Sequence, residues 1–269
     1  MKHSALNSLF LSMQLFFRES GQGRPIIILH GLMGSSDNWL PQAKMLSDEY
    51  RVFIVDQRNH GQSPHDDTLN YKVLANDLKD FIQQQGLEKP VILGHSMGGK
   101  TAMNFAVAYP EMVGALIVAD IAPKYYKVHH DVIVKGLKAI PIDTITTRGE
   151  ADQVLADYVK EEDVRQFLLK NLTRKPEGGF SWKINLPVID KSLEDIGQDL
   201  QFEGVYDGPA LFIRGANSNY VKDEDRDRIK QLFPKSTLIT MDTGHWIQAE
   251  KPKEFVEVVR NFLHAIKQA

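Results

Sequence analysis

The serine with the clearest chemical context in this chain is Ser96, in the Gly-x-Ser-x-Gly pattern of residues 94–98. A short apolar run, residues 90–93, precedes the pattern, and a segment typical of a helix, residues 100–106, follows it. A strand, a sharp turn carrying a serine and a helix form a nucleophile elbow, which exposes the hydroxyl at the helix N-terminus. The alternative is a glycine-rich turn in which the serine is passive.

A base must remove the proton of a serine hydroxyl before that hydroxyl becomes a good nucleophile. In an elbow topology the base is a histidine that follows the serine, with an acid between them in the sequence. His245 fits best, because it directly follows the last predicted strand and so lies at the same edge of the sheet as Ser96. His264 falls at the far end of the last predicted helix, and the pair His129-His130 falls in an insertion that rarely carries the base.

The acid has two candidates, Asp120 and Asp223. Its carboxylate would accept the other ring N–H of the histidine and stabilise the imidazolium. Many proteins of this topology carry the acid after the strand predicted at residues 210–215, but here no carboxylate comes before Asp223. We favour Asp120, because it lies at the C-terminal end of the strand next to the elbow strand. Asp223 has an alternative role as the N-cap of a helix. Ser218 is a candidate for an auxiliary hydrogen bond at the vacated acid position, although ordinary turn polarity explains it equally well.

An oxyanion hole needs two donors for the negative charge of the tetrahedral intermediate. We expect these to be the backbone N–H groups of Met97, which follows the nucleophile, and of Leu32 in the loop after an earlier strand. Three other histidines lie in these motifs: we expect His30 and His60 to hydrogen-bond loop backbone, and His95 to point below the elbow turn. No histidine shows the spacing of a metal site, so we expect no metal ion.

Composition narrows the class of protein. The chain has 269 residues with 42% hydrophobic and 25% charged residues, which suits one domain with an insertion. The net charge of −3 and the lack of basic stretches interleaved with aromatics argue against a nucleic-acid partner. The absence of cysteine excludes a thiol nucleophile and disulfides, and it favours a cytoplasmic location.

The N-terminal residues are interpreted as a strand rather than a signal peptide. Polar residues at Ser8, Ser12 and Gln14 interrupt the apolar residues there. No apolar run in the sequence approaches the roughly 18 residues of a membrane span. We therefore expect no membrane span, and the oligomeric state stays open.

Apolar runs alternate with segments of helical period along most of the chain. Strands are predicted at residues 10–18, 26–29, 51–56, 90–93, 115–120, 210–215 and 236–241, and helices at 37–46, 71–85, 100–109, 223–233 and 252–266. This alternation predicts an α/β fold with a mostly parallel, doubly wound sheet covered by helices on both faces.

The alternation stops between residues 124 and 205, where we find charged segments of helical character and no convincing buried strand, so we expect an all-helical insertion. We therefore expect residues 1–123 and 206–269 to form the core, and residues 124–205 to form an inserted helical cap over the site. The alternative is that the insertion pads the core elsewhere. Its apolar residues either line an acyl pocket or pack against one another: Ile133, Leu137, Phe167, Leu168 and Trp182.

Five ordered motifs, at residues 30–35, 56–64, 94–100, 119–123 and 244–246, resemble the α/β-hydrolase family and its subgroup of small YbfF-type carboxylesterases. The resemblance extends over essentially the whole chain. It implies hydrolysis of carboxylic esters or acyl thioesters, no cofactor and a helical cap. In that subgroup the acid follows the strand after the elbow strand, which supports Asp120. The resemblance does not specify the acyl chain of the substrate.

The leading hypothesis is therefore a serine hydrolase. Ser96 attacks the carbonyl with His245 as base, and water activated by the same histidine hydrolyses the acyl-enzyme. A carbon–carbon bond hydrolase or lyase uses the same pair and stays an alternative. Dehalogenase or epoxide hydrolase chemistry needs a carboxylate at the elbow, which Ser96 disfavours. A module that binds a small ligand without turnover is the alternative from another class.

Overall fold

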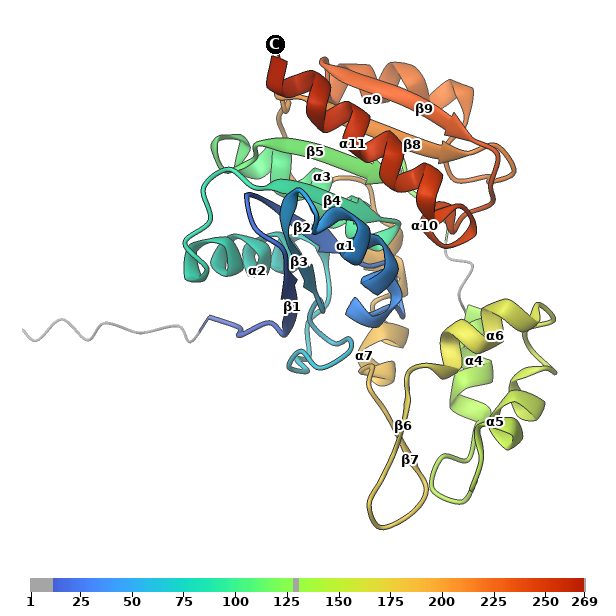
Figure 1. Ribbon diagram of the computed structural model, residues 1–269. Coiled ribbons are helices and arrows are strands. Elements are labelled where there is room, and N and C mark those ends of the chain that lie inside the picture. The colour runs from blue at the N-terminus through green and yellow to red at the C-terminus, as the bar shows by residue number, and fades with distance from the viewer. Residues whose placement is uncertain (1–11, 128–130, 269) are drawn as a thin grey trace, which may run out of the picture.

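The computed structural model describes residues 12–127 and 131–268, and its central feature is a seven-stranded sheet (Figure 1). The strands are β1 (Phe17–Ser20), β2 (Arg24–Leu29), β3 (Tyr50–Val55), β4 (Val91–His95), β5 (Ala115–Ala119), β8 (Ala210–Gly215) and β9 (Ser236–Met241). Their order is β1-β3-β2-β4-β5-β8-β9. Among these seven strands only β1 pairs antiparallel, so the predicted mostly parallel, doubly wound sheet is confirmed.

Alternate residues of the central strands are buried on opposite faces of the sheet. In β2, Ile27 and Leu29 contribute to one apolar cluster, and Ile26 and Ile28 contribute to another. A strand of a parallel sheet that is covered on both sides therefore consists of consecutive apolar residues. The first strand is shorter than predicted: β1 begins at Phe17, and residues 10 and 11 of the prediction lie outside the described residues.

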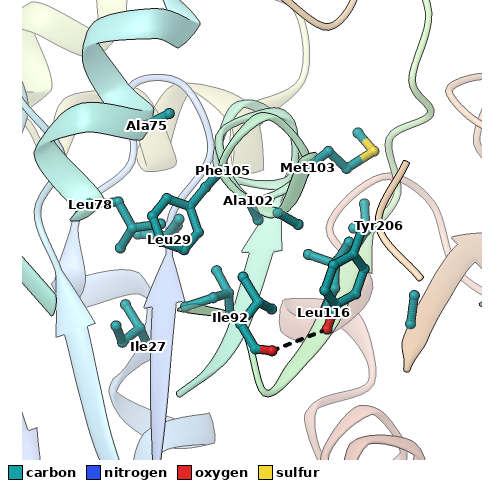
Figure 2. Close-up of a cluster of buried hydrophobic side chains, with 14 of the residues drawn as sticks. Ile27, Leu29, Ala75, Leu78, Ile92, Ala102, Met103, Phe105, Leu116 and Tyr206 are labelled. Atoms are coloured by element: carbon teal, nitrogen blue, oxygen red, sulfur yellow. Dashed lines mark hydrogen bonds between the residues drawn. The ribbon is translucent and has the colours of Figure 1, made fainter. Parts of the chain in front are cut away.

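Helices cover both faces of the sheet. One face carries α2 (Tyr71–Gln84), α3 (Met97–Ala108) and α9 (Arg226–Leu232); the other carries α1 (Leu40–Leu46) and α11 (Pro252–Gln268), which crosses in front of the strands in Figure 1. Figure 2 shows the first of these clusters, where Ala102 and Phe105 of α3 meet Leu29 and Ile92 of the sheet. Short helical turns complete the core: η1 (Ser36–Trp39), η2 (Pro110–Met112), η3 (Asp223–Asp225) and α10 (Ile247–Glu250).

Local sequence explains where α2 begins and ends. The side chain of Asn70 caps its first turn by accepting a hydrogen bond from the Val73 N–H. Leu74, Leu78 and Phe81 recur at helical spacing and are buried against the sheet. The helix ends just before Gly86, whose φ of +60° is the left-handed conformation that stops a helix.

The inserted segment, residues 124–205, contains α4 (Asp131–Ala139), α5 (Arg148–Leu155), α6 (Glu162–Leu169), α7 (Leu186–Lys191) and α8 (Leu193–Gly197). Figure 1 shows α4 to α6 at the lower right, on the side toward which the arrowheads of β5, β8 and β9 point. The apolar residues of the segment form one cluster together with residues of the core: Met33, Leu69, Tyr71, Leu74 and Met97.

The expectation that the inserted segment is all-helical was wrong. The hairpin β6 (Leu172–Arg174) and β7 (Phe180–Trp182) pairs antiparallel across a turn in which Gly178 and Gly179 have positive φ. Each strand has three residues, too few for alternation to be visible in the sequence. Burial of Leu172 and Phe180 in the cluster of the inserted segment stabilises the hairpin.

Membrane-spanning helices are not found in the part of the chain that the structure describes, because no helix there is both long and apolar enough.

Candidate active site

Ser96 lies in a tight turn between β4 and α3. Its φ of 52° and ψ of −118° place a non-glycine residue in the strained left-handed region. A Cβ atom on Gly94 would lie 2.1 Å from the Gly98 carbonyl oxygen, and one on Gly98 would lie 2.3 Å from the Leu29 carbonyl oxygen. The backbone of Ser96 is held on both sides, because its N–H donates to the Ala119 carbonyl at 3.1 Å and its carbonyl accepts from the N–H of Lys100 at 3.0 Å. The turn therefore has the geometry of a nucleophile elbow.

The carboxylate of Asp120 is fully buried at the end of β5 and accepts three hydrogen bonds. Its Oδ1 accepts from the Gly215 N–H at 2.9 Å. Its Oδ2 accepts from His245 Nδ1 at 2.8 Å and from the Ser218 hydroxyl. Three converging donors replace the water that this carboxylate loses on burial, so the charge can stay in the interior.

The competing acid, Asp223, lies elsewhere. Its side chain is 79% exposed and pairs with Arg214 at 2.9 Å and Arg226 at 3.1 Å. The adjacent arginines lower its pKa through these hydrogen bonds and charges. Asp120, and not Asp223, is the carboxylate that contacts His245.

Two aromatic side chains fix the ring of His245. Tyr220 stacks on it with ring centroids 3.9 Å apart and an interplanar angle of 16°, and the His95 ring lies at 4.7 Å. His95 Nε2 donates to the His245 backbone carbonyl at 2.8 Å. Burial, and then the proximity of His245, lower the pKa of His95 to about 3, so its ring stays neutral while it donates this bond. The sequence motif placed His95 beside the nucleophile but held no signal for Tyr220.

Ser96 and His245 line the same cavity. Because Nδ1 of His245 donates to Asp120, its Nε2 is the nitrogen free to accept a proton. The hydrogen bonds of the described residues do not include one from the Ser96 hydroxyl to this ring. Such bonds are often long in a free enzyme and tighten once substrate is bound.

This cavity, called here the large cavity, has a volume of about 330 Å³ and lies between the sheet loops and the inserted segment. Ile133, Phe167 and Leu168 line it, as one of the two interpretations of these residues expects. Leu137 and Trp182 instead pack within the inserted segment, as the other interpretation expects.

Leu32, in the loop after β2, lines the large cavity together with Ser96. The preceding carbonyl, of Gly31, accepts from the N–H of Gly34 at 3.0 Å and from His30 Nδ1 at 2.8 Å. In a planar trans peptide the N–H points opposite to the C=O, so these two donors aim the Leu32 N–H away from the His30 ring. It bonds to no protein acceptor among the described residues. Met97 begins α3, so its N–H is one of the helix donors without an intrahelical acceptor.

His30 and His60 form a buried pair behind this loop, with ring centroids 5.1 Å apart. His30 Nε2 accepts from the Gln57 N–H at 3.0 Å, so only its Nδ1 carries a proton. Burial lowers the pKa of His30 to about 4, and burial with the nearby His30 lowers that of His60 to about 3. His60 Nδ1 lies 2.9 Å from the Arg58 carbonyl, in agreement with the predicted role in holding a loop.

The remaining histidines considered from the sequence lie away from this cavity or outside the described residues. His264, on α11, pairs with Glu49 at 2.6 Å and is half-exposed. His129 and His130 lie outside the described residues. Across residues 12–127 and 131–268, no cluster of three or more His, Cys, Asp or Glu could hold a metal ion.

Known proteins resemble this chain over most of its length. The family described as alpha/beta hydrolase fold matches residues 24–138. The sn-1-specific diacylglycerol lipase ABHD11 of Danio rerio is 38% identical over 256 residues, or 92% of this chain and 80% of that protein. Esterase YbfF of Escherichia coli is 37% identical over 243 residues, or 89% of this chain and 93% of that protein. A solved structure named "Marine microorganism esterase" is 44% identical with a TM-score of 0.91, covering 93% of this chain and all of that chain.

The chain belongs to the α/β-hydrolase family. The resemblance found in the sequence and the predicted fold are both confirmed. In this α/β hydrolase, Ser96, Asp120 and His245 follow β4, β5 and β9, which are parallel members of one sheet. The carboxyl ends of parallel strands meet at one edge, which is where such sheets bind ligands.

The close backbone contact behind Ser96 generates a first prediction. Replacing Gly94 with alanine should lower the free energy of unfolding by about 3 kcal/mol or more, because the new methyl group would overlap the Gly98 carbonyl. Urea unfolding followed by circular dichroism measures the change. Gly149→Ala is the matched control, since its nearest neighbouring atom is 3.7 Å away and alanine favours the helix. Equal stability of both variants would contradict the steric argument.

The buried neutral histidines should make the protein sensitive to acid. His30, His60 and His95 have lowered pKa values in the folded state, of about 4, 3 and 3. Below pH 6.5 the unfolded chain binds protons that the folded state does not, so the free energy of unfolding falls with pH by up to about 1.4 kcal/mol per pH unit for each histidine. Urea titrations at pH 7, 6 and 5 measure this slope. His60→Asn should reduce the slope by up to about 1.4 kcal/mol per pH unit, the contribution of one proton. A free energy of unfolding that does not change with pH would contradict the assignment of these histidines as buried and neutral.

Proposed function

We propose that this protein is a serine hydrolase that cleaves carboxylic esters or acyl thioesters through an acyl-enzyme. The observation that carries the proposal is the hydrogen bond from His245 Nδ1 to the buried carboxylate of Asp120, at a cavity that His245 shares with Ser96. The names of the relatives, an esterase and a lipase, support ester substrates. Ser96 is the nucleophile, His245 the general base and Asp120 the group that orients the histidine.

The reaction has two halves. His245 Nε2 takes the proton of Ser96 as Oγ attacks the carbonyl carbon, and the N–H groups of Leu32 and Met97 stabilise the oxyanion. The imidazolium, stabilised by Asp120, then gives its proton to the leaving oxygen or sulfur, and the acyl-enzyme remains. Water, deprotonated by the same histidine, attacks this ester, and the acid product leaves as Ser96 regains its proton.

Ser218 has an auxiliary role in this proposal. Its hydroxyl donates to the same Oδ2 that accepts from His245, and its oxygen accepts from the N–H of Tyr220 at 3.2 Å. The serine thus couples Asp120 to the loop that carries the ring stacked on His245. It orients the catalytic groups and does not contact the reacting atoms.

The division of the chain belongs to the same proposal. Residues 124–205 act as a cap over a core of residues 1–123 and 206–269, which is supported by their contribution to the walls of the large cavity. The chemistry uses side chains and backbone N–H groups alone and calls for no cofactor. A cytoplasmic location is proposed from the absence of cysteine.

Substitution of the nucleophile tests the proposal most directly. Ser96→Ala should lower kcat for p-nitrophenyl butyrate by about five to six orders of magnitude, because no other group can form the acyl-enzyme. It should also abolish labelling by a fluorophosphonate probe. The far-ultraviolet circular dichroism spectrum is expected to be unchanged. Turnover that survives the substitution would refute the proposal, and labelling of the wild type without turnover of any ester would favour a different reaction of the same serine.

The two acids can be separated by a matched pair of substitutions. Asp120→Asn should lower kcat by about 10³- to 10⁴-fold, because the amide cannot hold the same histidine tautomer or stabilise the imidazolium. Asp223→Asn should change kcat less than about twofold, since its exposed carboxylate pairs only with surface arginines, which contributes little. Initial rates with p-nitrophenyl butyrate measure both. A larger loss in the Asp223 variant would reverse the assignment.

A further inference from the structure

A second and much smaller cavity, of about 40 Å³, adjoins Ser96. The large and small cavities share Leu32, Ser96 and Tyr220 as wall residues. His245 lines only the large cavity, whereas Met97 lines only the small one. The nucleophile is therefore located between two spaces of very different size, with the histidine on the side of the larger one.

The position of the histidine decides which part of an ester occupies each cavity. His245 must donate its proton to the leaving oxygen, so that oxygen lies within hydrogen-bond reach of its ring. The alcohol attached to the oxygen then extends into the cavity that His245 lines. The oxyanion is directed at the N–H groups of Leu32 and Met97. Because the alcohol and the oxyanion occupy the other two directions around the carbonyl carbon, the acyl chain extends toward the small cavity.

Three polar side chains on the wall of the small cavity make hydrogen bonds to backbone carbonyls. The Tyr71 hydroxyl donates to the Ile196 carbonyl at 2.7 Å, and the Tyr126 hydroxyl donates to the Tyr220 carbonyl at 2.6 Å. The buried ammonium of Lys100 donates to the carbonyl of Gln198 at 2.6 Å and to that of Lys124.

What remains of that wall is mostly aromatic and aliphatic. The Lys100 ammonium lies over the rings of Tyr71 and Tyr126, 5.8 and 5.2 Å from their centroids. Leu193 of α8 completes the apolar surface, while Lys127 is exposed. Such a wall suits a hydrocarbon chain.

Size limits the two groups differently. A cavity needs about 10–15 Å³ to hold one water-sized group. The small cavity, with about 40 Å³, therefore has room for about three carbon-sized groups. The large cavity holds far more and adjoins an open groove of about 570 Å³, with which it shares Asn38, Phe167, Trp246 and Gln248 as lining residues. The space on the alcohol side thus continues into this groove, whereas the small cavity is bounded on one side by Leu193 and Ile196 of α8.

We infer that the substrate is an ester of a short, uncharged acyl group with a large apolar alcohol, with the acyl group in the small cavity. This inference rests on the proposed function, because it takes Ser96 and His245 as nucleophile and proton donor. The residues that limit acyl length are Leu193 and Ile196 of α8, and those that accommodate the alcohol belong to α4 and α6.

A pair of isomeric esters tests the orientation. Octyl acetate and methyl nonanoate have the same atoms and similar hydrophobicity, but their long chains lie on opposite sides of the ester. We expect kcat/KM to be at least about tenfold higher for octyl acetate, because a pocket discriminates by about tenfold or more for each methylene that does not fit. Equal values, or a preference for methyl nonanoate, would overturn the inference. Octyl butyrate should also be preferred over octyl hydrogen succinate, whose acyl chain ends in a carboxylate. The reverse preference would overturn the inference that the acyl group is uncharged.

Variants of α8 identify the residues responsible. Ile196→Ala should raise the ratio of kcat/KM for p-nitrophenyl octanoate to that for the acetate by about tenfold, and Leu193→Phe should lower kcat/KM for the butyrate more than for the acetate. Ile133→Ala, on the wall of the large cavity, is the matched control and should leave the acyl-length ratio unchanged. The fluorophosphonate probe reports whether each variant retains a reactive Ser96. An unchanged ratio in a reactive Ile196 variant would contradict the assignment of α8.

Failure of this inference can be told apart from failure of the proposed function. If Ser96→Ala abolishes turnover while methyl nonanoate is the better substrate, the serine mechanism stands and the orientation is wrong. If octyl acetate is hydrolysed equally by the wild type and by Ser96→Ala, the proposed function itself is wrong.

Discussion

Three backbone segments meet behind Ser96 so closely that no side chain fits between them. The carbonyl oxygens of Gly98 and Leu29 occupy the positions where Cβ atoms of Gly94 and Gly98 would lie. This contact forces the chain to reverse sharply from β4 into α3, with Ser96 in a strained left-handed conformation. The hydroxyl is thereby held at the rim of the sheet beside the start of a helix, and every other part of the site is positioned relative to it.

The buried carboxylate of Asp120 is the second constraint. A charge in the interior must have all its hydrogen bonds made, and here the donors come from three separate positions: Gly215, Ser218 and His245. One carboxylate therefore ties the loop after β8 to the loop after β9. Tyr220 then stacks on the ring of His245, so this histidine is oriented by packing as well as by charge.

Much of the fold could be predicted from residue patterns because parallel strands buried on both faces need consecutive apolar residues, as in Ile26 to Leu29. The hairpin of the inserted segment could not, because three-residue strands carry no period. At the site, motifs and chain order led to Ser96 and His245. The choice between Asp120 and Asp223 depended on a contact over 125 residues of sequence separation, between Asp120 and His245.

The amino-acid sequence by itself determined the family, the elbow and the alternation of strands and helices, because these depend on neighbours within a few positions along the chain. Only the tertiary structure decided which carboxylate contacts His245, which aromatic ring packs against that histidine, and that Ser96 lies between a large and a small cavity. Those features arise where loops after different strands converge with α8. The distances between these side chains depend on the packing of the whole molecule, so no local pattern in the sequence predicts them.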